Sequence, residues 1–295
     1  MCIRDRRWIE NRNNENYQTD GIVVKVNSLE YQRLLGFISR EPRWAVAYKF
    51  PSEQAITKLV EIGINVGRTG NLNPFAVLEP VQLGGVVIQH ATLHNEEDIL
   101  RKDIRIGDKV IIERAGEVIP QVIGPVAGSR TGAEIPFEMP GLCPSCSSLV
   151  SKIEGEAAHR CSNASCPSQK FEKIKHFVSK SAMDIEGLGE KLVKLLLDLG
   201  LISEFPDLYF LEREQLLNVE RMGEKSVTNL LSAIEKSKQR PLSSLISGLG
   251  VLHVGSETSE LLAKQFKSVD TIAQVSLENF EAIPGIGSIV GAALV

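Results

Sequence analysis

A chain of 295 residues that is 43% hydrophobic can bury a core, and its length predicts two or more domains. The formal net charge is −4 at pH 7, so the chain as a whole lacks a basic surface for nucleic acid, and any such binding must depend on local sites. No run of 18 consecutive apolar residues occurs, and we expect no membrane-spanning helix.

Two short strands with alternating apolar residues are predicted near the start of the chain. In the first strand Lys25 shares a face with Gly21, and in the second Lys49 shares a face with Ala45 and Ala47. Small neighbours let a ligand approach the backbone while the lysine ammonium group meets its charge. A solvated lysine at a sheet edge is the alternative explanation for either residue alone.

Many short strands with glycine-containing turns are predicted in the next part of the chain. Val60, Ile62, Ile64 and Val66 alternate along one strand, which ends in a tight turn at 67–70. This pattern favours a small antiparallel β-barrel of the oligonucleotide-binding (OB) kind, followed by a proline-rich connector. Further turns are expected at Gly84-Gly85, Gly107-Asp108 and Ala115-Gly116.

Four cysteines lie in one short segment with the spacing Cys143-x2-Cys146-x14-Cys161-x4-Cys166. Such spacing provides two pairs of thiolates that can reach one ion, and four thiolates suit Zn²⁺ in a closed, structural site. A pair of disulfides is the alternative. The prolines beside two of the cysteines and the absence of a secretory signal favour reduced thiols that bind a metal.

The pattern becomes helical after residue 169, and an all-α domain is expected there. Apolar residues recur at helical spacing in two segments, which are Leu192, Leu195, Leu196, Leu199 and Val227, Leu230, Leu231, Ile234.

Glycines recur through this helical half with a nearly fixed period of 34, 32 and 32 residues. Such a period indicates a repeated helix-hairpin-helix unit. Exposed N–H groups at a glycine turn and the helix N-terminus together form an anion site, so these turns are candidate contacts for DNA phosphates. Glycines that only cap helices are the alternative. The glycines in question are Gly187, Gly189, Gly223, Gly255, Gly285 and Gly287.

The order of these signals resembles the NAD-dependent bacterial DNA ligases. Residues 20–25 are similar to motif IV of the nucleotidyltransferases, and residues 44–50 are similar to motif V. Residues 66–70, 91–95 and 114–120 resemble signature stretches of the family's OB domain. The four-cysteine finger and the hairpin array follow in the order that the family has.

The resemblance implies a reaction and roles for individual residues. The family seals nicks in double-stranded DNA with NAD⁺, through a lysyl-adenylate and then a DNA-adenylate. By resemblance Lys25 and Lys49 contact the adenylate, and Asp20 serves Mg²⁺ or Mn²⁺ or its water. Arg68 and His94 are expected near the nick. A monomer in the bacterial cytoplasm, associated with the nucleoid and not with a membrane, is expected.

The resemblance also implies how this multi-domain α+β chain is divided. No lysine here stands in the Lys-x-Asp-Gly motif that holds the family's nucleophile, and residues 1–6 match no pattern, so we expect a fragment that is inactive alone. A non-enzymatic DNA-binding scaffold is the alternative function, and an ATP-using ligase or capping-type enzyme would not be expected to carry the finger and hairpins. The expected parts are a remnant of the nucleotidyltransferase (adenylation) domain (1–52), an OB-fold (53–138), a four-cysteine zinc finger (139–168) and a truncated helix-hairpin-helix domain (169–295).

Overall fold

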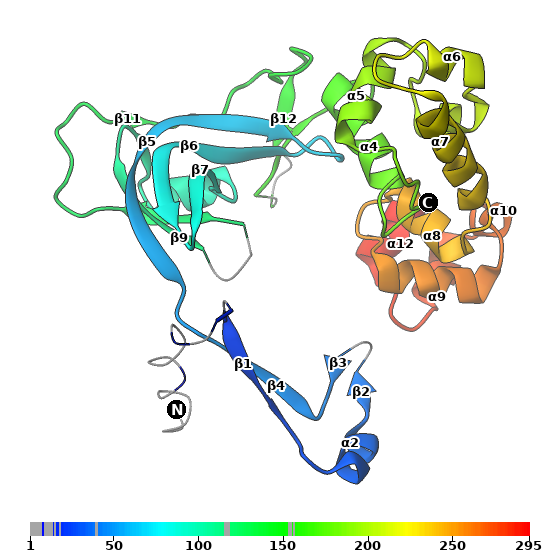
Figure 1. Cartoon of the computed structure of the whole chain (residues 1–295), viewed down its shortest axis with the longest axis horizontal. Coiled ribbons are helices and arrows are strands. Elements are labelled where there is room, and N and C mark those ends of the chain that lie inside the picture. Colours follow the sequence, from blue (N-terminus) through cyan, green and yellow to red (C-terminus); the bar gives the residue numbers. More distant parts are fainter. Residues whose placement is uncertain are drawn as a thin grey trace. The chain divides into compact units, whose positions relative to one another are not determined.

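The computed structural model describes residues 8, 14, 16–17, 19–38, 41–114, 119–152, 155 and 157–295. It separates into two compact units (Figure 1). Unit 1 comprises Met1–Asn65 and Asn73–Met139, and unit 2 comprises Val66–Leu72 and Pro140–Val295. Within the described part of the chain, no helix has the length and apolar character needed to cross a bilayer. The expected mixture of β-barrel and helical domains is confirmed.

Unit 1 begins with a two-stranded antiparallel sheet that confirms the first two predicted strands. Gly21 lies opposite Lys49 at one end, and Lys25 lies opposite Ala45 at the other. A Cβ atom at Gly21 would lie 2.4 Å from the carbonyl oxygen of Tyr48, so only glycine permits this close pairing. The elements of this part are β1 (Gly21–Lys25), α2 (Leu29–Leu35), β2 (Phe37–Ile38), β3 (Glu41–Pro42) and β4 (Ala45–Lys49).

The rest of unit 1 is a five-stranded barrel with the strand order β10-β7-β6-β5-β9. Strand β10 pairs with β9 and meets β7 through one residue pair, Gln121 with Thr92, so this seam is short. The strands are β5 (Glu53–Val66), β6 (Leu72–Leu83), β7 (Val86–Thr92), β9 (Lys109–Arg114) and β10 (Gln121–Pro125). Outside the barrel lie α3 (Glu96–Arg101), β8 (Arg105–Ile106) and β11 (Ile135–Pro136), and β8 pairs with β11.

The barrel core corrects one detail of the predicted pattern. Val60 is 51% exposed, whereas Leu59 is fully buried and Ile62 is also buried. Val60 and Glu61 are consecutive and both face outward, so the alternation of buried and exposed residues changes phase in the middle of β5. A regular alternation extended backward from Val66 therefore placed Val60 on the wrong face of the strand. The turns at Gly84-Gly85 and Gly107 are confirmed, while Ala115-Gly116 lies outside the described residues.

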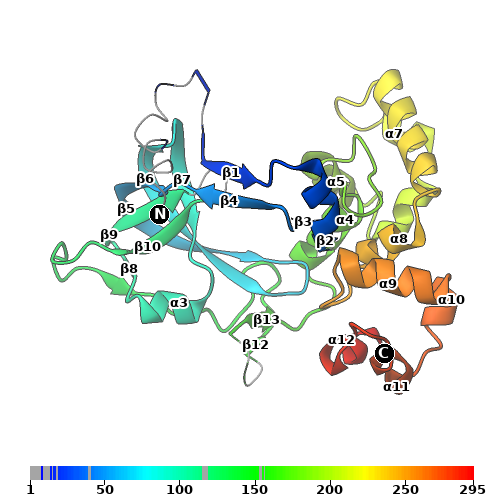
Figure 2. The same cartoon turned by 90° about the horizontal axis from the view of Figure 1, so that it is seen from below.

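Unit 2 combines a small sheet with a series of helices (Figure 2). The predicted line Val227, Leu230 and Ile234 is buried, which confirms that face of α7. The prediction that Leu199 belongs to the apolar face of the preceding helix is wrong, because α5 ends at Asp198 and the Leu199 side chain is 53% exposed. The elements are β12 (Val150–Lys152), β13 (His159–Cys161), α4 (Pro167–Phe177), α5 (Glu190–Asp198), the 3-10 helix η2 (Phe205–Phe210), α6 (Arg213–Leu217), α7 (Glu224–Ser237), α8 (Leu242–Leu249), α9 (Ser256–Phe266), α10 (Val269–Ile272), α11 (Leu277–Glu281) and α12 (Ser288–Leu294).

Candidate nucleic-acid and metal-binding sites

The two predicted lysines lie on one face of the β1–β4 sheet. Residues directly opposite each other in an antiparallel pair project to the same side, and Lys25 and Lys49 both belong to such pairs on the same side. Their Cα positions are four residues apart along the sheet, or about 13 Å. The space between them is lined by the small residue Ala47 and by Val23.

Asp20 forms an ion pair with Lys49, and both side chains are exposed. The hydrogen bond and the charge of Lys49 hold the pKa of Asp20 below its usual value. The structure therefore brings together the carboxylate and one of the two lysines that the sequence singled out. Lys25, at the other end of the same face, is also exposed.

His94 lies where β7 leaves the barrel, beside the short seam with β10. Its backbone has a positive φ of 60°, and its amide donates a hydrogen bond to the Thr92 hydroxyl at 3.1 Å. Its imidazole Nε2 lies 3.1 Å from Oε1 of Gln121. The exposed ring is thus held at the rim of the barrel by residues from both strands of the seam.

Arg68 stands at the tip of the β5–β6 hairpin, and this tip belongs to unit 2. Its guanidinium lies against Gly250 at the end of α8, where an added Cβ would be 2.8 Å from Nη1. Burial lowers the pKa of Arg68, although the group stays protonated at any ordinary pH. The sequence pointed to this arginine but did not anticipate that its side chain is half-buried.

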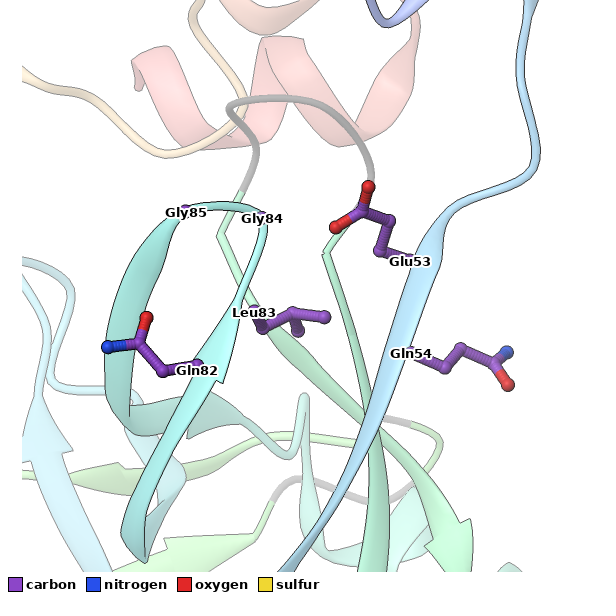
Figure 3. A pocket seen from close by; sticks show the side chains of 6 residues that line it. All are labelled: Glu53, Gln54, Gln82, Leu83, Gly84 and Gly85. Carbon is purple, nitrogen blue, oxygen red and sulfur yellow. The ribbon is translucent and has the colours of Figure 1, made fainter. Parts of the chain in front are cut away.

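Two open hollows lie on the barrel. One, of about 480 Å³, is lined by Glu53, Gln54, Gln82, Leu83 and the Gly84-Gly85 turn (Figure 3). Among the described residues, none of the predicted site residues lines it. The other, of about 450 Å³, includes Asn65, Asn73, Phe75, His90 and Thr92, and the rings of Phe75 and His90 are 5.7 Å apart.

The four cysteines form one cluster. All four sulfur atoms lie within 4.8 Å of one another, with 3.9 Å between Cys143 and Cys166 and 3.5 Å between Cys146 and Cys161. Zn–S bonds of about 2.3 Å in a tetrahedron place sulfurs about 3.8 Å apart, so the cluster fits Zn²⁺. A disulfide would need about 2.05 Å, and the four thiols are free, which favours the metal over the disulfide alternative.

Local turns bring the thiols together. The amide of Cys143 donates to the carbonyl of Ser148, and Ser147 with its φ of 58° closes the first knuckle. Cys166 begins α4 and is followed by a proline at the first helical position. Burial raises the pKa of Cys161 to about 12, whereas the Ser148 hydroxyl lowers the pKa of Cys146 to about 6. A bound cation would stabilise the thiolate form of all four.

The hairpin turns of unit 2 repeat one geometry four times. Four of the six expected glycines are N-caps of helices, with φ between −92° and −75°. In each turn the residue before the glycine donates its N–H to the carbonyl three positions earlier, at 3.0 to 3.3 Å. An added Cβ would meet nothing within 4 Å among the described atoms, so no contact within the described chain requires glycine. These N-cap residues are Gly189 for α5, Gly223 for α7, Gly255 for α9 and Gly287 for α12.

The position two residues before each N-cap has a positive φ in all four turns. Glycine stands at this position only in the first and last turns, so the sequence pattern did not identify the equivalent residues of the second and third turns. Aligning the repeats on their N-cap glycines would have revealed them. The residues are Gly187 with φ 89°, Arg221 with 65°, His253 with 64° and Gly285 with 98°.

The barrel, the four-thiol cluster and the hairpin array define a class of modular protein that joins an OB-fold to a four-cysteine finger and helix-hairpin-helix motifs. Models of known families match successive parts of the chain. The model of the NAD-dependent DNA ligase adenylation domain matches residues 3–53, that of the OB-fold domain of the same ligases matches 56–134, and that of their C4 zinc finger domain matches 143–167. A tandem helix-hairpin-helix model matches 179–236, and a helix-hairpin-helix motif matches 244–295. The chain therefore contains domains of the NAD-dependent DNA ligase family, in the order adenylation domain, OB-fold and zinc finger.

Curated relatives support the same assignment. The DNA ligase of Dehalococcoides mccartyi (strain CBDB1) is 50% identical over 300 residues, which cover 98% of this chain and 44% of the relative. The DNA ligase of Rubrobacter xylanophilus is 53% identical over 289 residues, covering 98% and 42%. The DNA ligase of Roseiflexus sp. (strain RS-1) is 47% identical over 290 residues, covering 98% and 40%. The chain therefore spans less than half the length of these relatives.

Proposed function

We propose that this chain is part of an NAD⁺-dependent ligase that seals nicks in duplex DNA. It would comprise the DNA-binding domains of that ligase and the end of its adenylation domain. In that reaction AMP passes from NAD⁺ to a lysine and then to the 5′-phosphate of the nick, and the 3′-hydroxyl displaces it. No lysine of this sequence stands in a Lys-x-Asp-Gly motif, so the chain alone is expected to bind nicked DNA without taking up AMP. A monomer in the bacterial cytoplasm, at the nucleoid, completes the proposal.

The β1–β4 face is proposed to contact the adenylate. Lys25 and Lys49 project to the same side, as two cations must if they share one phosphate-bearing ligand. Negative charge develops on the non-bridging phosphate oxygens during each transfer, and fixed ammonium groups stabilise it. Asp20, paired with Lys49, would in addition orient Mg²⁺ or Mn²⁺ or a water bound to it.

The repeated hairpin geometry is the observation that carries the DNA-binding proposal. Each N-cap glycine presents backbone N–H groups at a helix N-terminus, which attracts phosphate. The empty surroundings of these glycines leave room for a sugar-phosphate backbone to approach. Such contacts position a protein on DNA without reading its sequence. Arg68 and His94 are proposed to act near the nick.

A binding experiment on the whole chain tests this proposal. Gly223→Asp combined with Gly255→Asp places two carboxylates where phosphates are expected, while aspartate remains a good N-cap and the backbone there suits any residue. Affinity for a labelled nicked duplex should fall at least tenfold, with no loss of melting temperature. Wild-type affinity should also decrease as salt rises.

Gly141→Asp is the matched control, because it adds the same kind of charge in unit 2, away from the hairpin turns, at a glycine whose surroundings are also empty among the described atoms. Its affinity should equal that of the wild type. Unchanged binding by the double variant, or an equal loss in the control, would refute the phosphate contacts. Separately, incubation with labelled NAD⁺ and Mg²⁺ should leave no AMP on the chain, and covalent label would contradict the expected inactivity.

A further inference from the structure

The tip of the β5–β6 hairpin lies against the thiol cluster within unit 2. The carbonyl oxygen of Gly70 accepts a hydrogen bond of 2.9 Å from the amide of Cys161. The next residue, Asn71, forms an antiparallel bridge with Arg160, whose Nε donates to the Asn71 side chain at 2.9 Å. The tip therefore extends the small β12–β13 sheet on the strand that ends in a metal ligand.

A second residue holds Cys161 through its other backbone group. Gln169 is only 5% exposed, and its Nε2 donates to the carbonyl oxygens of Cys161 and Asn163, both at 3.0 Å. These two carbonyls belong to the loop that joins Cys161 to Cys166. Gln169 lies in the first turn of α4, so it ties the start of the helix to this loop.

Gly70 lies in close contact with both Cys161 and Gln169. A Cβ atom at Gly70 would lie 2.6 Å from the carbonyl oxygen of Cys161 and 2.9 Å from Nε2 of Gln169. Gly70 also has a φ of 82°, which L-residues with side chains rarely adopt. Glycine is required here by both conformation and space, unlike the N-cap glycines of the hairpins.

We infer that the hairpin tip (residues 66–72) is a structural part of the metal centre, with Gly70 and Gln169 as positioning residues that hold Cys161 and set the affinity of the four thiolates for their ion. Groups that orient metal ligands without touching the ion commonly change affinity about 10- to 100-fold when they are removed. The inference does not depend on the proposed ligase function. It makes metal retention depend on a glycine far upstream of Cys143, the first cysteine of the cluster.

Titration of the whole, metal-stripped chain with Co²⁺ tests the inference, because Co²⁺ in a tetrahedral thiolate site absorbs visible light. Gly70→Ala should lower the Co²⁺ affinity about 10- to 100-fold, through the clash with Cys161. Gln169→Met keeps the side-chain volume but removes both donated hydrogen bonds, and it should lower affinity about tenfold. The control is Gly132→Ala, which meets the same backbone restriction at φ 93° in unit 1 with no neighbour within 4 Å among the described atoms. Its Co²⁺ affinity should match the wild type.

Melting temperatures measured with and without metal distinguish a role of Gly70 and Gln169 in metal binding from a role in folding alone. A bound ion raises the melting temperature according to its affinity, so the gap between loaded and stripped protein should narrow in Gly70→Ala and in Gln169→Met but not in Gly132→Ala. Wild-type Co²⁺ affinity in Gln169→Met, or an equal loss in the control, would overturn the inference. If Gly70→Ala does not fold, the Gln169→Met titration decides the matter by itself.

Discussion

The guanidinium of Arg68 packs against the backbone of Gly250, so a loop that leaves the barrel strands becomes part of the packing of the helical unit. Gly250 ends α8 in the left-handed conformation, and its amide bonds the carbonyl of Ser247. That same carbonyl lies 2.7 Å from Nε2 of His176 in α4. Arg68 therefore contacts the point at which two helices of unit 2 are joined.

Replacing Gly250 by alanine should reveal this contact. Gly250 and Gly200 share a φ of 67°, and a left-handed alanine costs about 1–2 kcal/mol at either site. Gly250→Ala should cost more than Gly200→Ala, because only its Cβ meets Arg68. In an Arg68→Ala background the excess should disappear. Urea unfolding of the single and double variants gives the coupling, and a coupling of zero would show that the contact carries no energy.

Removal of the metal should unfold the finger. The described residues between Cys143 and Cys166 include two strands of only three residues each, so metal binding supplies most of the segment's folding energy. Stripping the ion with a chelator should lower the melting temperature and speed amide exchange in β12 and β13. Exchange in β9 of the barrel serves as the internal reference. A melting curve that does not change after confirmed metal loss would contradict this prediction.

The carboxylate of Glu134 should stabilise the 131–134 loop of unit 1 only when it is ionised. The amide of Thr131 donates to its carboxylate, as do the amide of Gly132 and the Thr131 hydroxyl, and these bonds lower its pKa to about 2. Because the folded pKa is below the unfolded value of 4.5, this contribution is complete above about pH 4.5 and is lost as pH falls toward 2. Glu134→Gln should remove that part of the pH dependence. Denaturant unfolding at several pH values measures the free energy of unfolding of both proteins. If it decreased equally between pH 4.5 and 2 in the wild type and in Glu134→Gln, Glu134 would not be the group responsible.

Gly21→Ala should separate β1 from β4. Its Cβ would lie 2.4 Å from the backbone oxygen of Tyr48, a contact that no rotamer relieves. The amide of Phe50, which donates to the carbonyl of Asp20, should exchange faster, while amides of the barrel keep their protection. Gly124→Ala, with no neighbour within 4 Å in the described structure, is the control. Equal protection of Phe50 in both variants would refute the proposed tight pairing.

Features set by short-range sequence patterns were predictable. The spacing of Cys143, Cys146, Cys161 and Cys166 identified the cluster, because chelation requires nearby pairs of thiols. The period of the N-cap glycines identified the hairpins. The face shared by Lys25 and Lys49 followed once the two strands were known to pair.

Contacts between distant segments could not be predicted from periodicity. Nothing near Gln169 in the sequence indicates that its amide reaches the carbonyl of Cys161, and nothing near Arg68 indicates Gly250. Strand β10 was missed in a stretch interpreted as a connector, because it is five residues long, has a register shift between Val122 and Gly124, and ends in Pro125. The phase change in β5 was missed because alternation alone assumes a regular strand.

Cys166 is both the last thiol of the cluster and the residue from which α4 starts, since its carbonyl accepts the amide of Lys170 at 3.0 Å. The rotational setting of this helix is thereby tied to the ion. One amino acid inserted just after Cys166 would turn the apolar side of α4 by about 100°. Phe177, which stacks on Phe205 with ring centroids 4.5 Å apart, would then leave its place in the core. Within the finger, loop length should accordingly be fixed between Cys166 and α4 and freer between Cys146 and Cys161, which no helix follows directly.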